Sequence, residues 1–423
     1  MDKNKSPWLW VPTLYFAEGI PYFIVNVVSV TMFKRLGMSN ADLAMYTSLL
    51  YLPWVVKPLW SPLVDVVRTK RWWVLAMQVL MTVCFAALAL GLPSRTGAPV
   101  GAFVISLIIF YITAMLSATH DIAADGYYML ALNEHQQSLF VGIRSTFYRI
   151  ASVFGQGVIV VVAGLLETRY GDIPKAWTVT LLMSSAIFLA ATVWHIIILP
   201  KENRPLPSQG EKRNMMAAFG TFFSKPGILL AIVFLLLYRL PEALSIKMLT
   251  PFLLDPESAG GLGLTTAQSG LVYGTVGVIA LTIGGILGGV WSAKVGLRKA
   301  LWPMALSLAL PCAVYLYMAM AQPTNILTVY FCVALDQFGY GFGFTAYMLF
   351  MIWFSQGGYS TSHYSICTAF MALSMMVPGF FAGMLQEALG YTGFFALVMV
   401  CCLATVAVTA FLPSKIDSSY GRK

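Results

Sequence analysis

Two carboxylates four residues apart are the first candidates for chemistry in this chain. Asp121 and Asp125 lie in ATHDIAADGYYM, which continues an apolar run nearly long enough to cross a bilayer. Residues four apart share one face of a helix, whereas His120 points about 100° away from that face. Two carboxylates on one buried face repel each other and favour proton uptake. We expect proton coupling here; the alternative is a helix cap or a salt bridge to Arg144 or Arg149.

A third carboxylate, Glu18, lies in YFAEGIPYF beside two residues that weaken a helix. Gly19 and Pro21 free backbone groups at this point. Tyr15 precedes Glu18 by three residues and Tyr22 follows it by four, so both share its face. We expect this face to line a cavity and Glu18 to be a further proton-coupling candidate; a kink whose Glu pairs with a neighbouring helix is the alternative.

Other polar residues lie inside apolar segments, where a charge costs about 2.5–3.5 kcal/mol at the bilayer centre. A buried Arg needs an anion as its partner, and aromatic rings beside a carboxylate suit a sugar. A structural ion pair between Arg239 and Glu242, and ordinary helix packing around Asp336, remain alternatives. The predicted substrate-binding residues are Tyr15, Glu18, Tyr22, Arg149, Gln156, Arg239, Glu242, Asp336, Tyr340 and Tyr347.

A charged connector, SPLVDVVRTKRWW, follows the second apolar segment. Its acid, Asp65, and its bases Arg68 and Arg71 can form a charge lock that holds one state of a transporter closed. Membrane anchoring by the basic residues and the two tryptophans is the alternative. We predict a gating role for Asp65, Arg68 and Arg71.

The composition indicates a membrane protein. Of 423 residues, 59% are hydrophobic and 10% are charged, whereas soluble domains carry about 25% charged residues. The net charge of +9 does not indicate nucleic-acid binding, because the basic residues lie in short connectors rather than in one patch. No phosphate-cradling GxxxxGK[ST] motif and no metal-ligand spacing occur. We therefore predict neither an enzyme nor a protein that carries a cofactor or metal.

The elements that must position these residues are twelve apolar segments, each about 20 residues or longer, as a membrane-spanning helix requires. The fold class predicted is an all-α membrane protein with twelve transmembrane helices in two pseudo-symmetric six-helix bundles. The segments cover residues 8–33, 42–60, 72–93, 99–130, 139–167, 176–199, 226–254, 265–292, 300–321, 325–354, 361–387 and 391–412.

The polar stretch PKENRPLPSQGEKRN divides the chain in the middle. We predict an N-terminal bundle at 1–199, a cytoplasmic linker at 200–225 and a C-terminal bundle at 226–423. Most Lys and Arg residues of the loops fall on one side, which places both termini in the cytoplasm. Repeated halves of this kind hold a substrate site near the bilayer midplane.

Four stretches resemble a known family. They begin FAEGIPY, YLPWVVKPLWSPLVD, SATHDIAADGYYM and GFGFTAYMLF. Together with twelve helices in two halves, they resemble the major facilitator superfamily, and within it the AmpG-like muropeptide permeases and the related acetyl-CoA transporters. Glu18, Lys57, Asp65, Asp121 and Asp125 match positions of these motifs, and so does Arg149. The connector after segment eight has Ala293 and Lys294 and lacks an acid corresponding to Asp65.

The resemblance implies a proton symporter of the bacterial inner membrane that imports peptidoglycan fragments. We therefore predict a monomeric, multi-pass permease for an amino-sugar or muropeptide-like solute, with protons and the lipid bilayer as its other partners. The alternative is a facilitator-type transporter of another solute, such as an acyl-CoA, a siderophore or a drug, working as an importer or an exporter.

Overall fold

The structure is a computed structural model of the full chain, and it describes residues 6–132, 134–201, 215–357, 360–412 and 416. The side chains at 62, 65, 66, 134–139, 141, 142, 145, 215–218, 360 and 361 also fall outside the description. The gating prediction for Asp65 therefore lies outside the described residues. Throughout the described ranges, every regular element is a helix, which confirms the predicted all-α class.

Ten of the described helices are long and apolar enough to cross a membrane. One of them, α19 (Ser360–Phe411), contains two of the predicted segments, because Gly390 at φ 66° and ψ 173° breaks the helix between them. The predicted segment 42–60 is not one helix but three short ones, α3 (Asn40–Leu49), α4 (Leu52–Val56) and η2 (Lys57–Leu59). Counting α19 twice and adding this broken segment accounts for all twelve predicted segments.

Prolines explain the broken segment. Pro53 and Pro58 each lie in the first turn of a short helix, where the missing N–H costs nothing. Inside a continuous helix either proline would remove a hydrogen bond and clash with the preceding turn. The chain therefore restarts at each proline, and Lys57 lies at such a restart.

The chain groups into two compact units, unit 1 (Met1–Met38 and Val56–Glu211) and unit 2 (Ser39–Val55 and Lys212–Lys423). The division near residue 211 falls in the predicted linker. Residues 39–55, which include α3, group with unit 2 although they belong to the first half of the sequence. The division into bundles at 1–199 and 226–423 stays a prediction.

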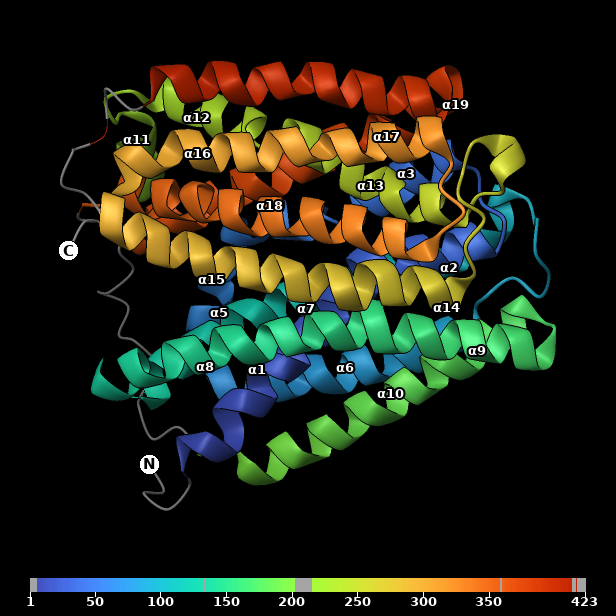
Figure 1. The fold of residues 1–423 in the computed structure, drawn as a ribbon. Helices are drawn as coiled ribbons and strands as arrows, with labels where there is room; N and C mark the ends of the chain where they lie inside the picture. Colours follow the sequence, from blue (N-terminus) through green and yellow to red (C-terminus); the bar gives the residue numbers. More distant parts are fainter. Residues whose placement is uncertain (1–5, 133, 202–214, 358–359, 413–415, 417–423) are drawn as a thin grey trace. The chain divides into compact units, whose positions relative to one another are not determined.

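Unit 1 is built around α1, most of whose residues are buried and which packs on α7, α8 and α10. In Figure 1, α8 continues into α9 as one long helix, with the π-helical turn η4 between them. The elements of unit 1 are α1 (Pro7–Phe23), η1 (Ile24–Val28), α2 (Ser29–Arg35), α5 (Ser61–Val66), α6 (Lys70–Leu90), η3 (Val100–Phe103), α7 (Val104–Ala131), α8 (Glu134–Val153), η4 (Phe154–Ile159), α9 (Val160–Tyr170) and α10 (Ile173–Ile198).

Unit 2 contains α3 and the helices from α11 onward, which Figure 1 labels. Its α3 packs against α13 and α19. The further elements are α11 (Met215–Phe223), α12 (Ile228–Leu237), α13 (Leu240–Leu254), η6 (Glu257–Ala259), α14 (Thr266–Ser269), η7 (Gly270–Gly277), α15 (Val278–Val295), α16 (Leu297–Ala309), η8 (Leu310–Cys312), α17 (Ala313–Ala321) and α18 (Ile326–Phe354).

The contact between α15 and α18 depends on glycine. A Cβ at Gly284 would collide with the backbone of Phe338, and one at Gly341 would collide with the backbone of Leu281. Small residues allow the two backbones to approach closely, which is how helices associate in lipid. Helix packing in this stretch of α18 is the alternative that the sequence left open around Asp336.

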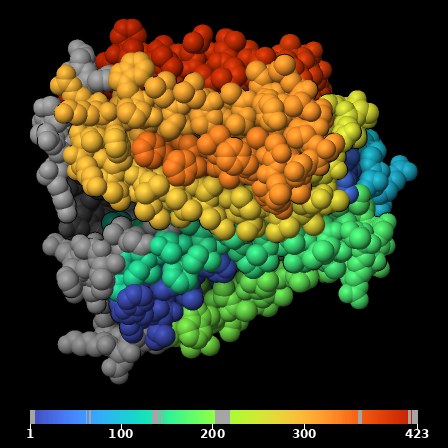
Figure 2. All heavy atoms as spheres, viewed as in Figure 1, coloured from blue at the N-terminus to red at the C-terminus, as the bar shows by residue number. Residues whose placement is uncertain are grey.

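The outer face of α15, α16 and α18 is apolar, and Figure 2 shows their side chains in yellow to orange. Ile286 on α15 is 59% exposed and Phe331 on α18 is 67% exposed. Apolar side chains at this exposure would be unfavourable in water but match hydrocarbon. This surface agrees with a lipid-embedded protein.

Candidate functional site

In unit 1, α7 brings Asp121 and Asp125 onto one face, and each carboxylate meets a base. Asp121 Oδ2 lies 2.5 Å from Lys57 Nζ. Asp125 Oδ1 lies 2.8 Å from the Arg144 guanidinium and accepts a hydrogen bond of 3.0 Å from the Tyr15 hydroxyl. The salt bridge to Arg144 is one of the alternatives that the sequence left open. It does not exclude proton coupling, because an ion pair can be released when a proton arrives.

Glu18 completes this cluster from α1. Its side chain is 6% exposed, and its carboxyl group interacts electrostatically with those of Asp121 and Asp125. Its Oε2 has no hydrogen-bond partner among the described residues. Neighbouring carboxylates repel each other, which favours proton uptake by one of them. This group of acids is therefore the candidate place for a proton. We call Glu18, Lys57, Asp121, Asp125 and Arg144 the acid–base cluster.

Aromatic rings surround Arg144. Its guanidinium carbon lies 4.4 Å from the ring centre of Tyr15 and 5.2 Å from that of Tyr128. Tyr15 therefore contacts both members of the Asp125–Arg144 pair, which fixes their orientation. The sequence predicted a substrate contact for Tyr15, and here its ring and hydroxyl support the acid–base cluster. Arg144 was expected only as an alternative partner, because helix periodicity shows a residue's face but not the opposite helix.

His120 belongs to a different network on the other side of α7, as its offset from Asp121 predicted. Its Nε2 lies 3.0 Å from Gln78 Nε2 on α6. Gln78 Oε1 lies 3.0 Å from His195 Nδ1, and His195 Nε2 lies 3.1 Å from Thr13 Oγ1. Both histidines and Gln78 are buried. The network joins α1, α6, α7 and α10. Gln78 and His195 were not predicted from the sequence, because their partners are distant in the chain.

Arg149, Gln156 and Tyr22 lie elsewhere in unit 1. Arg149 is partly buried on α8, and Gln156, at the π-helical turn η4, donates a hydrogen bond of 2.7 Å to Ser152 Oγ. Tyr22 packs its ring 6.2 Å from that of Tyr148. The substrate contacts predicted for Arg149, Gln156 and Tyr22 stay predictions.

In unit 2, Arg239 and Glu242 form a bidentate ion pair. Two nitrogens of Arg239 donate to the Glu242 carboxylate at 2.8 and 3.1 Å, and both side chains are 5% exposed. Arg239 also donates to the Tyr340 hydroxyl at 2.9 Å and lies 4.7 Å from the ring centre of Phe344. The ion pair that the sequence left open as an alternative is present, and it places a cation among aromatic rings; the substrate contact stays a prediction.

The other predicted residues of unit 2 are held by core contacts. Asp336 Oδ2 accepts a hydrogen bond of 2.6 Å from the Tyr315 hydroxyl and one of 3.1 Å from Gln337. Tyr347 is 0% exposed, and its hydroxyl donates to the Leu235 carbonyl at 2.7 Å. In this arrangement Tyr347 is a core residue, whereas Tyr340 is only partly buried.

The bases of the predicted charge lock have other contacts. Arg71 donates to the carbonyl oxygens of Leu199 at 3.0 Å and Ile196 at 2.8 Å, at the carboxyl end of α10. A cation stabilises the carbonyl groups at a helix end. Arg68 is exposed and lies 6.0 Å from the ring centre of Trp72. A gating role for Arg68 and Arg71 stays a prediction.

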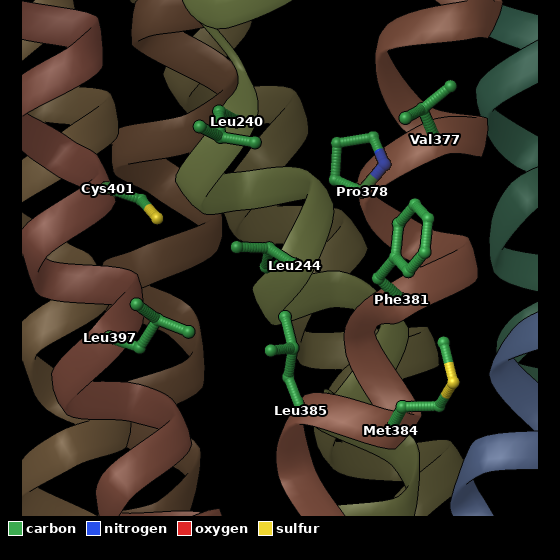
Figure 3. A pocket seen from close by; sticks show the side chains of 9 residues that line it. All are labelled: Leu240, Leu244, Val377, Pro378, Phe381, Met384, Leu385, Leu397 and Cys401. Carbon is green, nitrogen blue, oxygen red and sulfur yellow. The ribbon is translucent and has the colours of Figure 1, made fainter.

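A groove of about 500 Å³ runs between α13 and α19 in unit 2. Figure 3 shows that its lining is apolar, and no predicted site residue belongs to it. It therefore does not suit a sugar. Among the described residues, no group of three or more His, Cys, Asp or Glu side chains could hold a metal ion. The lining residues are Leu240, Leu244, Val377, Pro378, Phe381, Met384, Leu385, Leu397 and Cys401.

Apolar helices long enough to span a membrane and ion pairs within those helices are typical of polytopic membrane transporters. The family model of the Major Facilitator Superfamily matches residues 13–355. The chain therefore belongs to the Major Facilitator Superfamily.

Curated relatives confirm the predicted resemblance to AmpG-like permeases. The chain is 24% identical to the putative transporter AmpG 4 of Rickettsia conorii over 96% of both chains. It is 24% identical to the anhydromuropeptide permease of Escherichia coli K12, over 90% of this chain and 74% of that protein. An uncharacterized protein of Haemophilus influenzae is 25% identical over 93% of this chain and 92% of the relative.

Solved structures agree in fold. A bacterial homolog of the human lysosomal transporter Spinster matches with a TM-score of 0.76 at 14% identity, over 98% of both chains. The xylose transporter XylE from E. coli matches with a TM-score of 0.69 at 13% identity, over 97% of this chain and 100% of that chain. These likenesses show the fold alone.

Proposed function

We propose that the protein is a proton-coupled permease of the bacterial inner membrane that imports an amino-sugar or muropeptide-like solute by alternating access. The observation that carries the proton coupling is the buried Glu18, which has no ion pair among the described residues and interacts with the carboxyl groups of Asp121 and Asp125. The muropeptide part is supported by the resemblance to AmpG-like permeases. We also propose cytoplasmic termini and a monomer.

The acid–base cluster supplies the coupling. Asp121 is held by Lys57 and Asp125 by Arg144, so Glu18 is the acid of the cluster that has no ion pair among the described residues. Proton loss from the Glu18–Asp121 pair leaves two adjacent carboxylates, whose repulsion favours a rearrangement or the return of a proton. Glu18 is therefore the principal proton carrier, and the charges of Asp121 and Asp125 influence its affinity for the proton.

Each half of the chain offers its own candidate contacts to a solute. In unit 2 the Arg239–Glu242 pair and Tyr340 combine a charge pair with an aromatic edge, which suits a hydroxylated ring with polar substituents. In unit 1 Arg149, Gln156 and Tyr22 offer donors and an aromatic ring. These residues are the proposed solute contacts.

Neutralising Glu18 should uncouple transport. In proteoliposomes containing Glu18→Gln, we expect pH-driven accumulation of labelled N-acetylglucosaminyl-anhydromuramic acid to fall by about tenfold or more, because the amide cannot cycle a proton. Exchange of labelled against unlabelled solute across the membrane, without a pH gradient, should persist. The measurement is uptake with and without an imposed pH gradient, acid outside.

Glu257→Gln is the matched control, because Glu257 is an exposed acid of unit 2. It should transport like the unmodified protein. If the unmodified protein accumulates the disaccharide equally well without a pH gradient, proton coupling is wrong. If it transports other solutes but not this disaccharide, the proposed substrate class is wrong. Proton coupling is then tested by comparing Glu18→Gln with the unmodified protein, using a solute that is transported.

A further inference from the structure

Lys247 on α13 is a buried basic residue without a counter-ion in the described part of the chain. Its side chain is 6% exposed. Its ammonium donates one hydrogen bond, to Thr47 Oγ1 on α3 at 3.0 Å. No carboxylate of the described residues forms an ion pair with it within 4.0 Å. Two of its three N–H groups and its charge are therefore not matched by those residues.

The Thr47 hydroxyl cannot neutralise this charge. It donates its own proton to the Leu43 carbonyl at 2.6 Å and only accepts from Lys247. Just beyond the end of α3, the ring centre of Tyr51 lies 5.6 Å from the ammonium. A ring face attracts a cation weakly compared with an anion. The surroundings thus orient the ammonium but do not compensate its positive charge.

A second polar group without a partner lies in the same place. The Ser48 hydroxyl is fully buried, and its oxygen has no hydrogen-bond partner among the described residues. A Cβ at Gly379 on α19 would lie 2.7 Å from Ser48 Oγ and 3.1 Å from Lys247 Cε. The two groups therefore flank the same glycine, where α3, α13 and α19 meet.

Other ionised groups of the protein show what is missing here. Lys57 and Arg239 each have a carboxylate partner at 2.5 and 2.8 Å. A buried charge without a partner is destabilising and is retained in membrane helices where it serves a substrate or ion. Lys247 therefore differs from Lys57 and Arg239, since it has no carboxylate partner among the described residues.

We propose that Lys247 is the anchor for a carboxylate of the transported solute, with Ser48 as an auxiliary hydrogen-bond donor. This inference rests on the proposed function, since it identifies the solute as an anion. A compact ammonium with open donors suits a carboxylate as a point charge. The solute class is then an amino sugar bearing an acid, such as a muramic-type sugar with its lactyl carboxylate, rather than a neutral hexosamine.

The close approach of α19 at Gly379 adds a condition. In the present arrangement the three helices pack directly around Lys247 Cε and Ser48 Oγ, so a carboxylate binds Lys247 when α3 moves away from α19. The uncompensated ammonium favours that movement, because the anion then supplies the missing charge.

Binding of two matched ligands to the full chain in nanodiscs tests the anchor. The probes are N-acetylglucosaminyl-anhydromuramic acid and its methyl ester, which differ by one negative charge. We expect the unmodified protein to bind the acid at least about tenfold more tightly than the ester, which corresponds to about 1.4 kcal/mol. Lys247→Met should remove this preference and leave the affinity for the ester unchanged.

Two variants serve as controls. Lys247→Arg retains the charge and should retain the preference for the acid. Lys294→Gln removes an exposed cation of unit 2 and should leave both affinities unchanged. Lys247→Met should also melt at a higher temperature than the unmodified protein without ligand, because it removes a buried charge that has no partner.

The outcomes separate this inference from the proposed function. Equal affinities for acid and ester in the unmodified protein, or an undiminished preference in Lys247→Met, would overturn the anchor. If neither ligand binds, the proposed substrate is wrong. The carboxylate anchor is then tested by comparing the thermal stability of the protein in sodium D-lactate with its thermal stability in D-lactamide. Stabilisation by lactate that is lost in Lys247→Met supports an anion site, and no difference between the two compounds overturns it.

Discussion

At the scale of single residues, the protein treats the charges of its membrane-spanning segments in two ways. Asp125 and Glu242 each have an arginine partner at 2.8 Å; the first pair joins α7 to α8, and the second lies within one helical turn at the start of α13. Glu18 and Lys247 instead lack an oppositely charged partner within salt-bridge distance in the described residues. The first group explains stability, and the second is where we expect protons and solute to act.

The Arg239–Glu242 pair yields a stability prediction. Glu242→Gln leaves a buried guanidinium without its carboxylate, and removing one partner of a buried pair costs about 3–5 kcal/mol. We expect a lower midpoint of thermal unfolding in detergent. The double variant Arg239→Leu/Glu242→Leu should recover most of the loss, since no unpaired charge remains. A double variant less stable than Glu242→Gln would contradict this account.

At the scale of elements, proline and glycine determine where helices break and how closely they pack. Pro53 and Pro58 divide the predicted segment 42–60, and Gly390 separates the two parts of α19. Both breaks occur at proline or glycine, which can be recognised in the sequence as residues that interrupt helices. The approach of α15 to α18 depends on glycine at points where even one methyl group would collide with the opposite backbone.

Two glycines of α15 offer a matched comparison. Gly284→Ala places a methyl group against the backbone of Phe338, whereas a methyl group on Gly289 would meet no atom within 4 Å. We expect Gly284→Ala to destabilise the protein by about 1–3 kcal/mol through overpacking. Gly289→Ala should be neutral or stabilise it by up to about 1 kcal/mol. Thermal unfolding of both variants is the measurement, and equal midpoints would refute the packing argument.

At the scale of the whole molecule, the chain is a membrane transporter of the Major Facilitator Superfamily. Its two compact units do not follow the sequence order strictly, because residues 39–55 group with the second unit. A segment of the first half thereby packs on α13 and α19 and buries Lys247. The grouping of α3 is therefore central to the inference about the solute.

The distribution of Lys and Arg predicts the orientation of the whole molecule. With both termini cytoplasmic, green fluorescent protein fused to the C-terminus should fluoresce, and alkaline phosphatase fused there should be inactive. Alkaline phosphatase fused after residue 96, in the connector that carries Arg95, should be active. The reverse pattern in the two fusions would show that the predicted orientation is wrong.

The sequence by itself determined the twelve apolar segments, the acids on α1 and α7 and the resemblance to AmpG-like permeases. Helix periodicity and the length needed to cross a bilayer act locally, so they are visible in a linear chain. Only the tertiary structure decided the partners: Lys57 for Asp121, Arg144 for Asp125, and Gln78 with His195 for His120. Helix packing determines which side chains face each other. It places Glu18 near other acids, and it leaves Lys247 without a carboxylate partner among the described residues.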